Sequence, residues 1–245
     1  MNYPINDPLF RVEVLSKSER PNLLSYLAMH QDYNESNVFD ELDKLSELSE
    51  KELGERLVRR CIKPSHFGIL EHPSITLNVI GFPHSVMVQA RTHRVGISFD
   101  CQSQRYTSQR IIDSFHNDDI ESVFYIRPVG DYLDRKGKKY TFTNADRKRH
   151  LDRTLTMVGD YVLDIERGFA EEHARDLLPQ NIRQDFVVTF NARSLLHFCD
   201  LRLPSDAQPE IRTMAEMIFN KFKEWMPECS EWYEKNRKNK NKLAP

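Results

Sequence analysis

The chain has 245 residues and nearly balanced charge, and these properties exclude several classes of protein. The formal net charge is −2, and the sequence pI is about 6.5. Because affinity for phosphate backbones requires a basic surface, this balance argues against a general nucleic-acid binder. No segment approaches the roughly 20 consecutive apolar residues that a membrane-spanning helix needs. We therefore expect a soluble protein.

Length and cysteine usage indicate one large domain in a reducing compartment. We expect a single catalytic domain over residues 1–235 and a basic, solvated tail over 236–245. The four cysteines are widely spaced, and no C-x-x-C pair or N-terminal signal peptide accompanies them. This pattern favours free thiols and a cytoplasmic location over a disulfide framework.

The first half of the chain predicts a helix followed by strands. Apolar residues recur at helical spacing over 49–64, where Ser49 and Glu52 form a capping box. Alternating apolar and polar residues predict a strand over 74–81, and the segment 84–90 is predicted as an antiparallel partner.

The second half predicts an irregular segment and then a mainly helical chain. The predicted elements are an irregular stretch over 115–140, helices over 144–166, 171–179, 191–204 and 208–226, and a buried strand over 185–190. Asn191 is the natural N-cap of its helix, and Pro209 lies near the first turn of the last one.

Cationic side chains gather in the string "RTHRVGISFDCQSQRYTSQR" at residues 91–110. They are Arg91, His93, Arg94, Arg105 and Arg110. Arginine suits phosphate because its planar guanidinium donates two parallel hydrogen bonds and keeps its charge. A flexible loop leaving a strand could wrap a phosphorylated ligand in this way. The alternative is a solvated edge whose arginines pair with Asp100 and other acids.

A second group of polar residues lies in "NARSLLHFCDLRL". Arg193 and His197 are four residues apart, so they share one face near the start of the predicted helix, where negative charge is favoured. Arg202 is nine positions beyond Arg193, about half a turn away around the helix axis. We therefore expect Arg202 to contact a different ligand, or a different part of one.

Other chemistries have weaker support in the sequence. Zinc binding by His66 and His72, or by His93 and Cys101, lacks the tight ligand spacing of zinc sites. Cys101 is a candidate nucleophile, because nearby cations lower the pKa of a thiol. The arginines would also serve a phosphate- or RNA-binding module. No G-x-G-x-x-G string or P-loop is present.

Two separated strings resemble motifs of the flavin-dependent thymidylate synthases. That family carries R-H-R, a short spacer, and serine with R-Y close behind. Here His93 and Arg94 match, and Ser103 follows after a spacer of eight residues. Thr92 replaces the first arginine, and Arg91 stands one place earlier. The strings "HARDLLP" and "NARSLLHFCDLRLPSDAQPEIR" then match in the right order, except for a proline where the family usually has tryptophan.

The resemblance implies which residues bind the flavin and the nucleotide. The implied FAD contacts are Thr92, His93, Arg94, Asn191, Arg193 and His197. The implied dUMP contacts are Gln89, Arg91, Gln102, Ser103, Gln104, Arg105, Arg175 and Arg202. Arg202 is the implied catalytic residue, beside the uracil carbonyl and N3. No metal is implied.

The resemblance also implies a fold, an assembly and a reaction. The implied fold is α/β, a single domain with a central, mostly antiparallel sheet flanked by helices. The implied homotetramer shares residues between active sites, and its only partners are the small molecules dUMP and folate. The reaction would be reductive methylation of dUMP to dTMP, with carbon from methylenetetrahydrofolate and with NADPH reducing the FAD. Neither Ser103 nor Cys101 would attack the ring.

Overall fold

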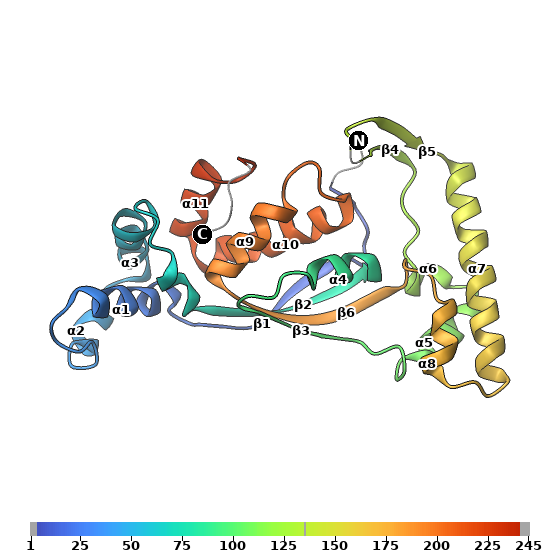
Figure 1. The fold of residues 1–245 in the computed structure, drawn as a ribbon, viewed down its shortest axis with the longest axis horizontal. Coiled ribbons are helices and arrows are strands. Elements are labelled where there is room, and N and C mark those ends of the chain that lie inside the picture. Colours follow the sequence, from blue (N-terminus) through green and yellow to red (C-terminus); the bar gives the residue numbers. More distant parts are fainter. Residues whose placement is uncertain (1–3, 135, 241–245) are drawn as a thin grey trace.

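The computed structural model describes residues 4–134 and 136–240 as a mixed α/β protein (Figure 1). In chain order its elements are β1 (Arg11–Lys17), α1 (Pro21–Tyr33), α2 (Leu42–Ser46), α3 (Glu50–Leu57), a π-helical turn (Val58–Ile62), a 3₁₀ turn (Gly68–Glu71), β2 (Ser74–Pro83), α4 (His84–Ala90), β3 (Ile97–Cys101), α5 (Ser108–His116), α6 (Ile120–Val123), β4 (Gly130–Leu133), β5 (Lys139–Phe142), α7 (Asn144–Glu166), α8 (Glu171–Ala174), a 3₁₀ turn (Arg175–Leu177), β6 (Arg183–Asn191), α9 (Ala192–Arg202), α10 (Pro209–Trp225) and α11 (Pro227–Asn236).

A four-stranded sheet with the order β1-β2-β6-β3 forms the centre of the molecule. Each pairing in this sheet is antiparallel, which confirms the predicted sheet type. Alternate residues of β2 and β6 point to one buried face, as the period of two requires. They are Ile75, Leu77, Val79, Phe186, Val188 and Phe190. Helices α4, α9 and α10 cover that face (Figure 1).

A second, smaller apolar cluster lies beside the sheet. It joins α5, α6, α7 and α8 through buried residues that include Ile111, Phe124, Val158 and Tyr161. Figure 1 shows α7 at the opposite side of the molecule from α1 and α3. Arg183 links the two parts, because its buried guanidinium donates to Asp7 Oδ2 at 2.8 Å, to Gly81 O at 2.8 Å and to Glu121 O at 3.1 Å.

Several predicted elements are confirmed by the structure. The predicted helix over 144–166 is α7, with the same two ends. Ser49 and Glu52 form the predicted capping box, and the Asn191 side chain caps α9 by accepting from Ser194 N at 2.8 Å.

The predicted strand over 84–90 is wrong, because this segment is helix α4. Pro83 has no N–H to continue strand pairing and instead precedes the first helical turn. Val86, Met87 and Ala90 are buried, whereas Val88 is 46% exposed. This is the spacing of a helix face and not of a strand, so the β-propensity of the two valines is overridden by packing.

Of the two alternatives for segment 91–110, a flexible loop and a solvated edge, the structure shows an edge strand and a helix within it. Residues Ile97–Cys101 form edge strand β3, and Ser108–His116 form α5. Arg110 is half-buried on α5, where its Nη2 donates to Arg183 O at 2.7 Å, so it holds the fold together and is not part of an anion-binding loop.

Residues 236–245 were expected to form a solvated tail, but Arg237 does not fit that expectation. It is buried against Asp200, with Nη2 2.7 Å from Oδ2. Residues 241–245 of that tail lie outside the described residues. No helix within the described ranges has the length and apolarity to cross a bilayer.

Candidate active site

The two predicted motifs meet where the loop after α4 packs on the start of α9. Asn191 N donates to Gly96 O at 3.2 Å, and Ser194 Oγ donates to Val95 O at 2.8 Å. Gly96 has a φ of +65°, and a Cβ there would lie 2.3 Å from both Asn191 Nδ2 and Ser194 Oγ. Glycine is therefore required here by conformation and by space.

His93 and Arg202 form the central contact between the motifs. Arg202 Nε donates to His93 Nε2 at 3.0 Å, and His93 is only 6% exposed. Burial, the Arg202 guanidinium and the neighbouring His197 together lower the pKa of His93 to about 4. The imidazole is therefore neutral at pH 7, and its Nε2 lone pair accepts from the guanidinium.

Further hydrogen bonds fix the Arg202 guanidinium in this position. Its Nη2 donates to Thr92 Oγ1 at 3.2 Å and to Gln89 O at 3.4 Å. Thr92 Oγ1 in turn donates to Gln89 O at 2.7 Å. Burial lowers the pKa of Arg202 from its ordinary value, but a guanidinium stays charged at neutral pH. The result is a preoriented cation held only by neutral partners.

His197 lies against the same pair. Its ring centroid is 5.5 Å from that of His93 in an edge-to-face arrangement. Its Nδ1 is buried and has no hydrogen-bond partner among the described residues. Buried polar atoms are usually paired, so this nitrogen indicates a missing ligand. The residues present therefore fit a flavin, whose ring edge carries both donors and acceptors.

The other predicted flavin contacts surround the start of α9. Arg193 Nη1 is 2.5 Å from Glu71 Oε1 on the preceding 3₁₀ turn, and Arg94 is exposed on the 91–96 loop. The side-chain oxygen of Asn191 is used by the helix cap, so its amide group is what remains for a ligand. The structure brings Thr92, His93 and His197 together. Arg94, Asn191 and Arg193 lie around them.

A second cationic group forms at α8. Arg105 Nε is 3.2 Å from Glu172 Oε2, and Arg175 Nε donates to Glu172 O at 3.3 Å. Arg105 also lies over the ring of Tyr106, 5.7 Å from its centroid. The structure therefore brings two of the predicted phosphate-binding arginines to Glu172, Arg105 to its carboxylate and Arg175 to its backbone oxygen.

The remaining predicted nucleotide contacts have mixed environments. Gln102 is held by the sheet, because its Oε1 accepts from Asp185 N at 3.1 Å. Ser103 Oγ accepts from Arg105 N at 3.4 Å, in the turn before α5. Gln104 is half-buried and Arg91 is exposed.

Among the described residues, no hydrogen bond or ion pair joins the Arg202 group to the Arg105 group. Arg175 precedes β6 and Arg202 ends the helix that follows it. Since β6 has nine residues, it is about 30 Å long. Figure 1 accordingly shows α8 beside α5 and α7, at the opposite end of β6 from the start of α9.

Sequence reasoning missed a polar cluster next to this site. Glu210 is fully buried and accepts from Tyr125 Oη at 3.0 Å, Arg127 Nε at 3.2 Å and Gln208 Nε2 at 2.8 Å. Gln208 Oε1 accepts from Gln89 Nε2, so the cluster touches the candidate site. The signal was available in the sequence, because Glu210 interrupts the apolar face of α10.

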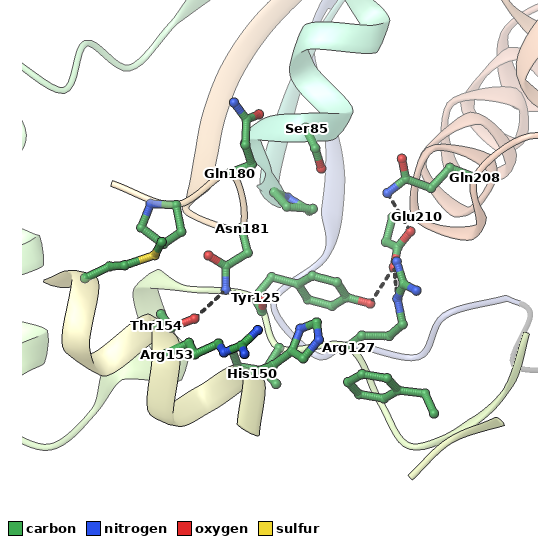
Figure 2. A pocket seen from close by; sticks show the side chains of 15 residues that line it. Ser85, Tyr125, Arg127, His150, Arg153, Thr154, Gln180, Asn181, Gln208 and Glu210 are labelled. Carbon is green, nitrogen blue, oxygen red and sulfur yellow. Dashed lines mark hydrogen bonds and ion pairs between the residues drawn. The ribbon is translucent and has the colours of Figure 1, made fainter. Parts of the chain in front are cut away.

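This cluster borders a cavity of about 360 Å³. Figure 2 shows Tyr125, Arg127, Gln208 and Glu210 at one side of it and His150 and Arg153 of α7 below. None of the predicted flavin or nucleotide contacts lines this cavity. It adjoins the candidate site only through the hydrogen bond between Gln208 and Gln89.

No metal centre is evident at either group. Within residues 4–134 and 136–240, no cluster of three or more histidine, cysteine or acidic side chains could hold a metal ion. Cys101 is half-buried on β3 and is a free thiol. Its strand partner is Phe186.

The family model described as thymidylate synthase complementing protein matches residues 13–228 of this chain. The chain is 31% identical to the flavin-dependent thymidylate synthase of Haloarcula marismortui, over 96% of this chain and 99% of that one. It is also 31% identical to the Halobacterium salinarum protein of the same name, over 96% and 100% of the two chains. The chain therefore belongs to the flavin-dependent thymidylate synthase family, which confirms the resemblance seen in the sequence.

A solved structure supports the same fold. The crystal structure of the UMP/dUMP methylase PolB from Streptomyces cacaoi, bound with 5-Br UMP, superimposes with a TM-score of 0.72. The two sequences are 22% identical, and the alignment covers 96% of each chain. The α/β single-domain fold expected from the sequence is thereby confirmed.

Proposed function

We propose that this protein is a flavin-dependent thymidylate synthase that converts dUMP to dTMP by reductive methylation. The observation that carries the proposal is the direct hydrogen bond from Arg202 Nε of one motif to His93 Nε2 of the other. Residues 109 positions apart thus build one polar centre. Family membership over most of the chain supports the same reaction.

Arg202 acts as the preoriented cation of the site. Placed beside the uracil carbonyl and N3, it favours negative charge that develops on the ring during transfer of the carbon. Neutral His93 orients the guanidinium by accepting from Nε without cancelling its charge. Because Thr92 and Gln89 O also hold it, little reorganisation is required as charge develops.

The flavin binds against the start of α9. Thr92, His93, Arg94, Asn191, Arg193 and His197 would hold it, and the His197 Nδ1, which has no partner among the described residues, supports a ligand at this ring. A bound FAD supplies the redox chemistry that side chains cannot perform. NADPH is the source of reducing equivalents, and methylenetetrahydrofolate is the source of the carbon.

The dUMP phosphate is bound by the cations around α8 and by nearby polar groups. Arg105 and Arg175 donate to it, and the carboxylate of Glu172 offsets the charge of Arg105. Gln89, Arg91, Gln102, Ser103 and Gln104 provide the remaining contacts. A homotetramer whose subunits each contribute residues, as the family resemblance implies, would bring this group and Arg202 to one site.

Spectroscopy and product analysis test the proposal directly. We expect the purified protein to be yellow, to bleach on addition of NADPH, and to form dTMP only when dUMP and methylenetetrahydrofolate are both present. A colourless protein whose affinity for RNA falls steeply with salt would instead support a phosphate-binding module.

The role of Cys101 separates two mechanisms. Its place on an edge strand next to Phe186, away from the Arg202 group, gives it no activating base among the contacts described. We expect Cys101→Ser to keep most of the rate of dTMP formation. Abolished turnover with unchanged flavin content would support a cysteine nucleophile instead.

A further inference from the structure

The last turn of α9 carries Arg202, and the backbone alone restrains it weakly. Arg202 is the final residue of α9, and Pro204, which has no N–H, follows two positions later. Leu203 N donates to Cys199 O at 3.0 Å. The carbonyl groups of a final helical turn otherwise lack partners within the helix, so helix ends fray. The position of Arg202 therefore depends on side chains that hold this turn.

Asp200 lies in the same turn and forms a buried ion pair with Arg237 at the end of α11. Arg237 Nη2 is 2.7 Å from Asp200 Oδ2, and Nε donates to Oδ1 at 3.3 Å. The two side chains are only 2% and 7% exposed. The guanidinium also lies over the ring of Phe67, 5.6 Å from its centroid. Two parallel hydrogen bonds fix both the position and the orientation of the carboxylate, so they join the last turn of α9 to α11.

This ion pair holds α9 from the side opposite the candidate site. Residues two positions apart on a helix differ by about 200° around its axis, so Asp200 faces away from the side where Arg202 contacts His93. At the other end of α9, Arg193 Nη1 is 2.5 Å from Glu71 Oε1. The helix is thus tied at both ends to segments that are distant in the sequence. A shift of its last turn would have to break the pair at Asp200.

We propose that Asp200 and Arg237 are positioning residues, whose ion pair fixes the last turn of α9 so that the Arg202 guanidinium stays on His93. The inference rests on the proposed function, because the catalytic role of Arg202 comes from it. Arg237 lies beyond residue 228, where the match to the family model ends, so no motif of that model includes it. Misplacement of a catalytic group by about 1 Å can cost about 10²-fold in rate.

The test uses the double variant Asp200→Asn/Arg237→Met. Removing Arg237 alone would leave a buried charge, whereas the double variant loses the tie and leaves no buried charge. Its free energy of unfolding in urea and its flavin content should therefore stay close to those of wild type. We expect kcat for dTMP formation to fall about tenfold or more, because Arg202 is no longer held in place.

A second measurement follows the contact itself and does not depend on activity. Arg202 is one of the causes that lower the pKa of His93 to about 4. Between pH 5 and pH 8, nuclear magnetic resonance should show the His93 imidazole of wild type as largely neutral. In the double variant the guanidinium moves away, so the pKa of His93 should rise and the imidazole should titrate within this range.

The matched control removes another ion pair of α11 that does not involve α9. Lys223 Nζ of α10 is 2.6 Å from Glu234 Oε1 of α11, and both side chains are 38% exposed. Lys223→Met/Glu234→Gln should therefore keep both kcat and the pKa of His93 at their wild-type values.

The outcomes separate this inference from the proposed function. If wild type forms no dTMP, the proposed function is wrong, while the titration of His93 still tests the contact. If Asp200→Asn/Arg237→Met keeps both the wild-type kcat and the wild-type pKa of His93, the pair only stabilises the fold and the inference is overturned. Arg237→Lys is the second variant should the double variant not fold. Lysine keeps the charge but lacks the planar fork, so kcat should again fall and the pKa of His93 should rise; no change in either value would overturn the inference.

Discussion

His93 should make the stability of this protein depend on pH below neutrality. The pKa of its imidazole is about 4 in the folded protein, against an ordinary value of 6.5. The unfolded chain takes up the proton at a higher pH than the folded protein. The free energy of unfolding therefore decreases as the pH falls from about 6.5, and this decrease is complete below about pH 4. The difference between the two pKa values corresponds to a full decrease of about 3 kcal/mol in the free energy of unfolding, of which about 2 kcal/mol is reached at pH 5.

The test is urea unfolding of wild type and His93→Gln at pH 7.5 and pH 5.0. Glutamine keeps an acceptor oxygen near the position of Nε2, so the hydrogen bond from Arg202 is retained, but it does not titrate. Other groups titrate equally in both proteins, so the difference between their two pH dependences isolates His93. We expect wild type to lose about 2 kcal/mol more than the variant on going to pH 5.0.

A control removes a histidine from the surface. His173→Gln changes an exposed side chain on α8 and should lose as much stability as wild type over the same pH range. If wild type and His93→Gln lose the same free energy of unfolding, His93 is not a buried neutral acceptor, and the account of how Arg202 is held would be refuted.

Three further predictions concern the motif contacts and the core. Arg202→Ala should keep the fold and the flavin but lower kcat by about 10²-fold or more, and near-normal dTMP formation would contradict its role. Gly96→Ala should lower the free energy of unfolding by at least about 2 kcal/mol, because it forces a φ of +65° and a 2.3 Å contact; an unchanged urea midpoint would contradict this. Arg237→Met should cost about 3 kcal/mol by leaving the Asp200 carboxylate buried without its cationic partner. The double variant with Asp200→Asn should recover most of that loss in the same urea assay.

Local patterns predicted the ends of several elements, and motif resemblance supplied the candidate site residues. The apolar spacing of 144–166 gave both ends of α7, because 3.6-residue periodicity and a following glycine depend only on neighbours in the chain. Such local signals fail where packing decides. In segment 84–90, two valines indicated a strand, but the burial of Val86, Met87 and Ala90 against other elements makes it a helix.

By itself the sequence determined the family and its motif residues, since these depend on residue identity and short-range spacing, and the antiparallel sheet was expected only from the family resemblance. Only the tertiary structure decided which of those residues touch. It placed Arg202 on His93, paired Arg105 with Glu172, and linked a buried carboxylate to Gln89 through Gln208. Contacts across a hundred residues depend on the register of strands and the path of the chain, and no local pattern encodes either one.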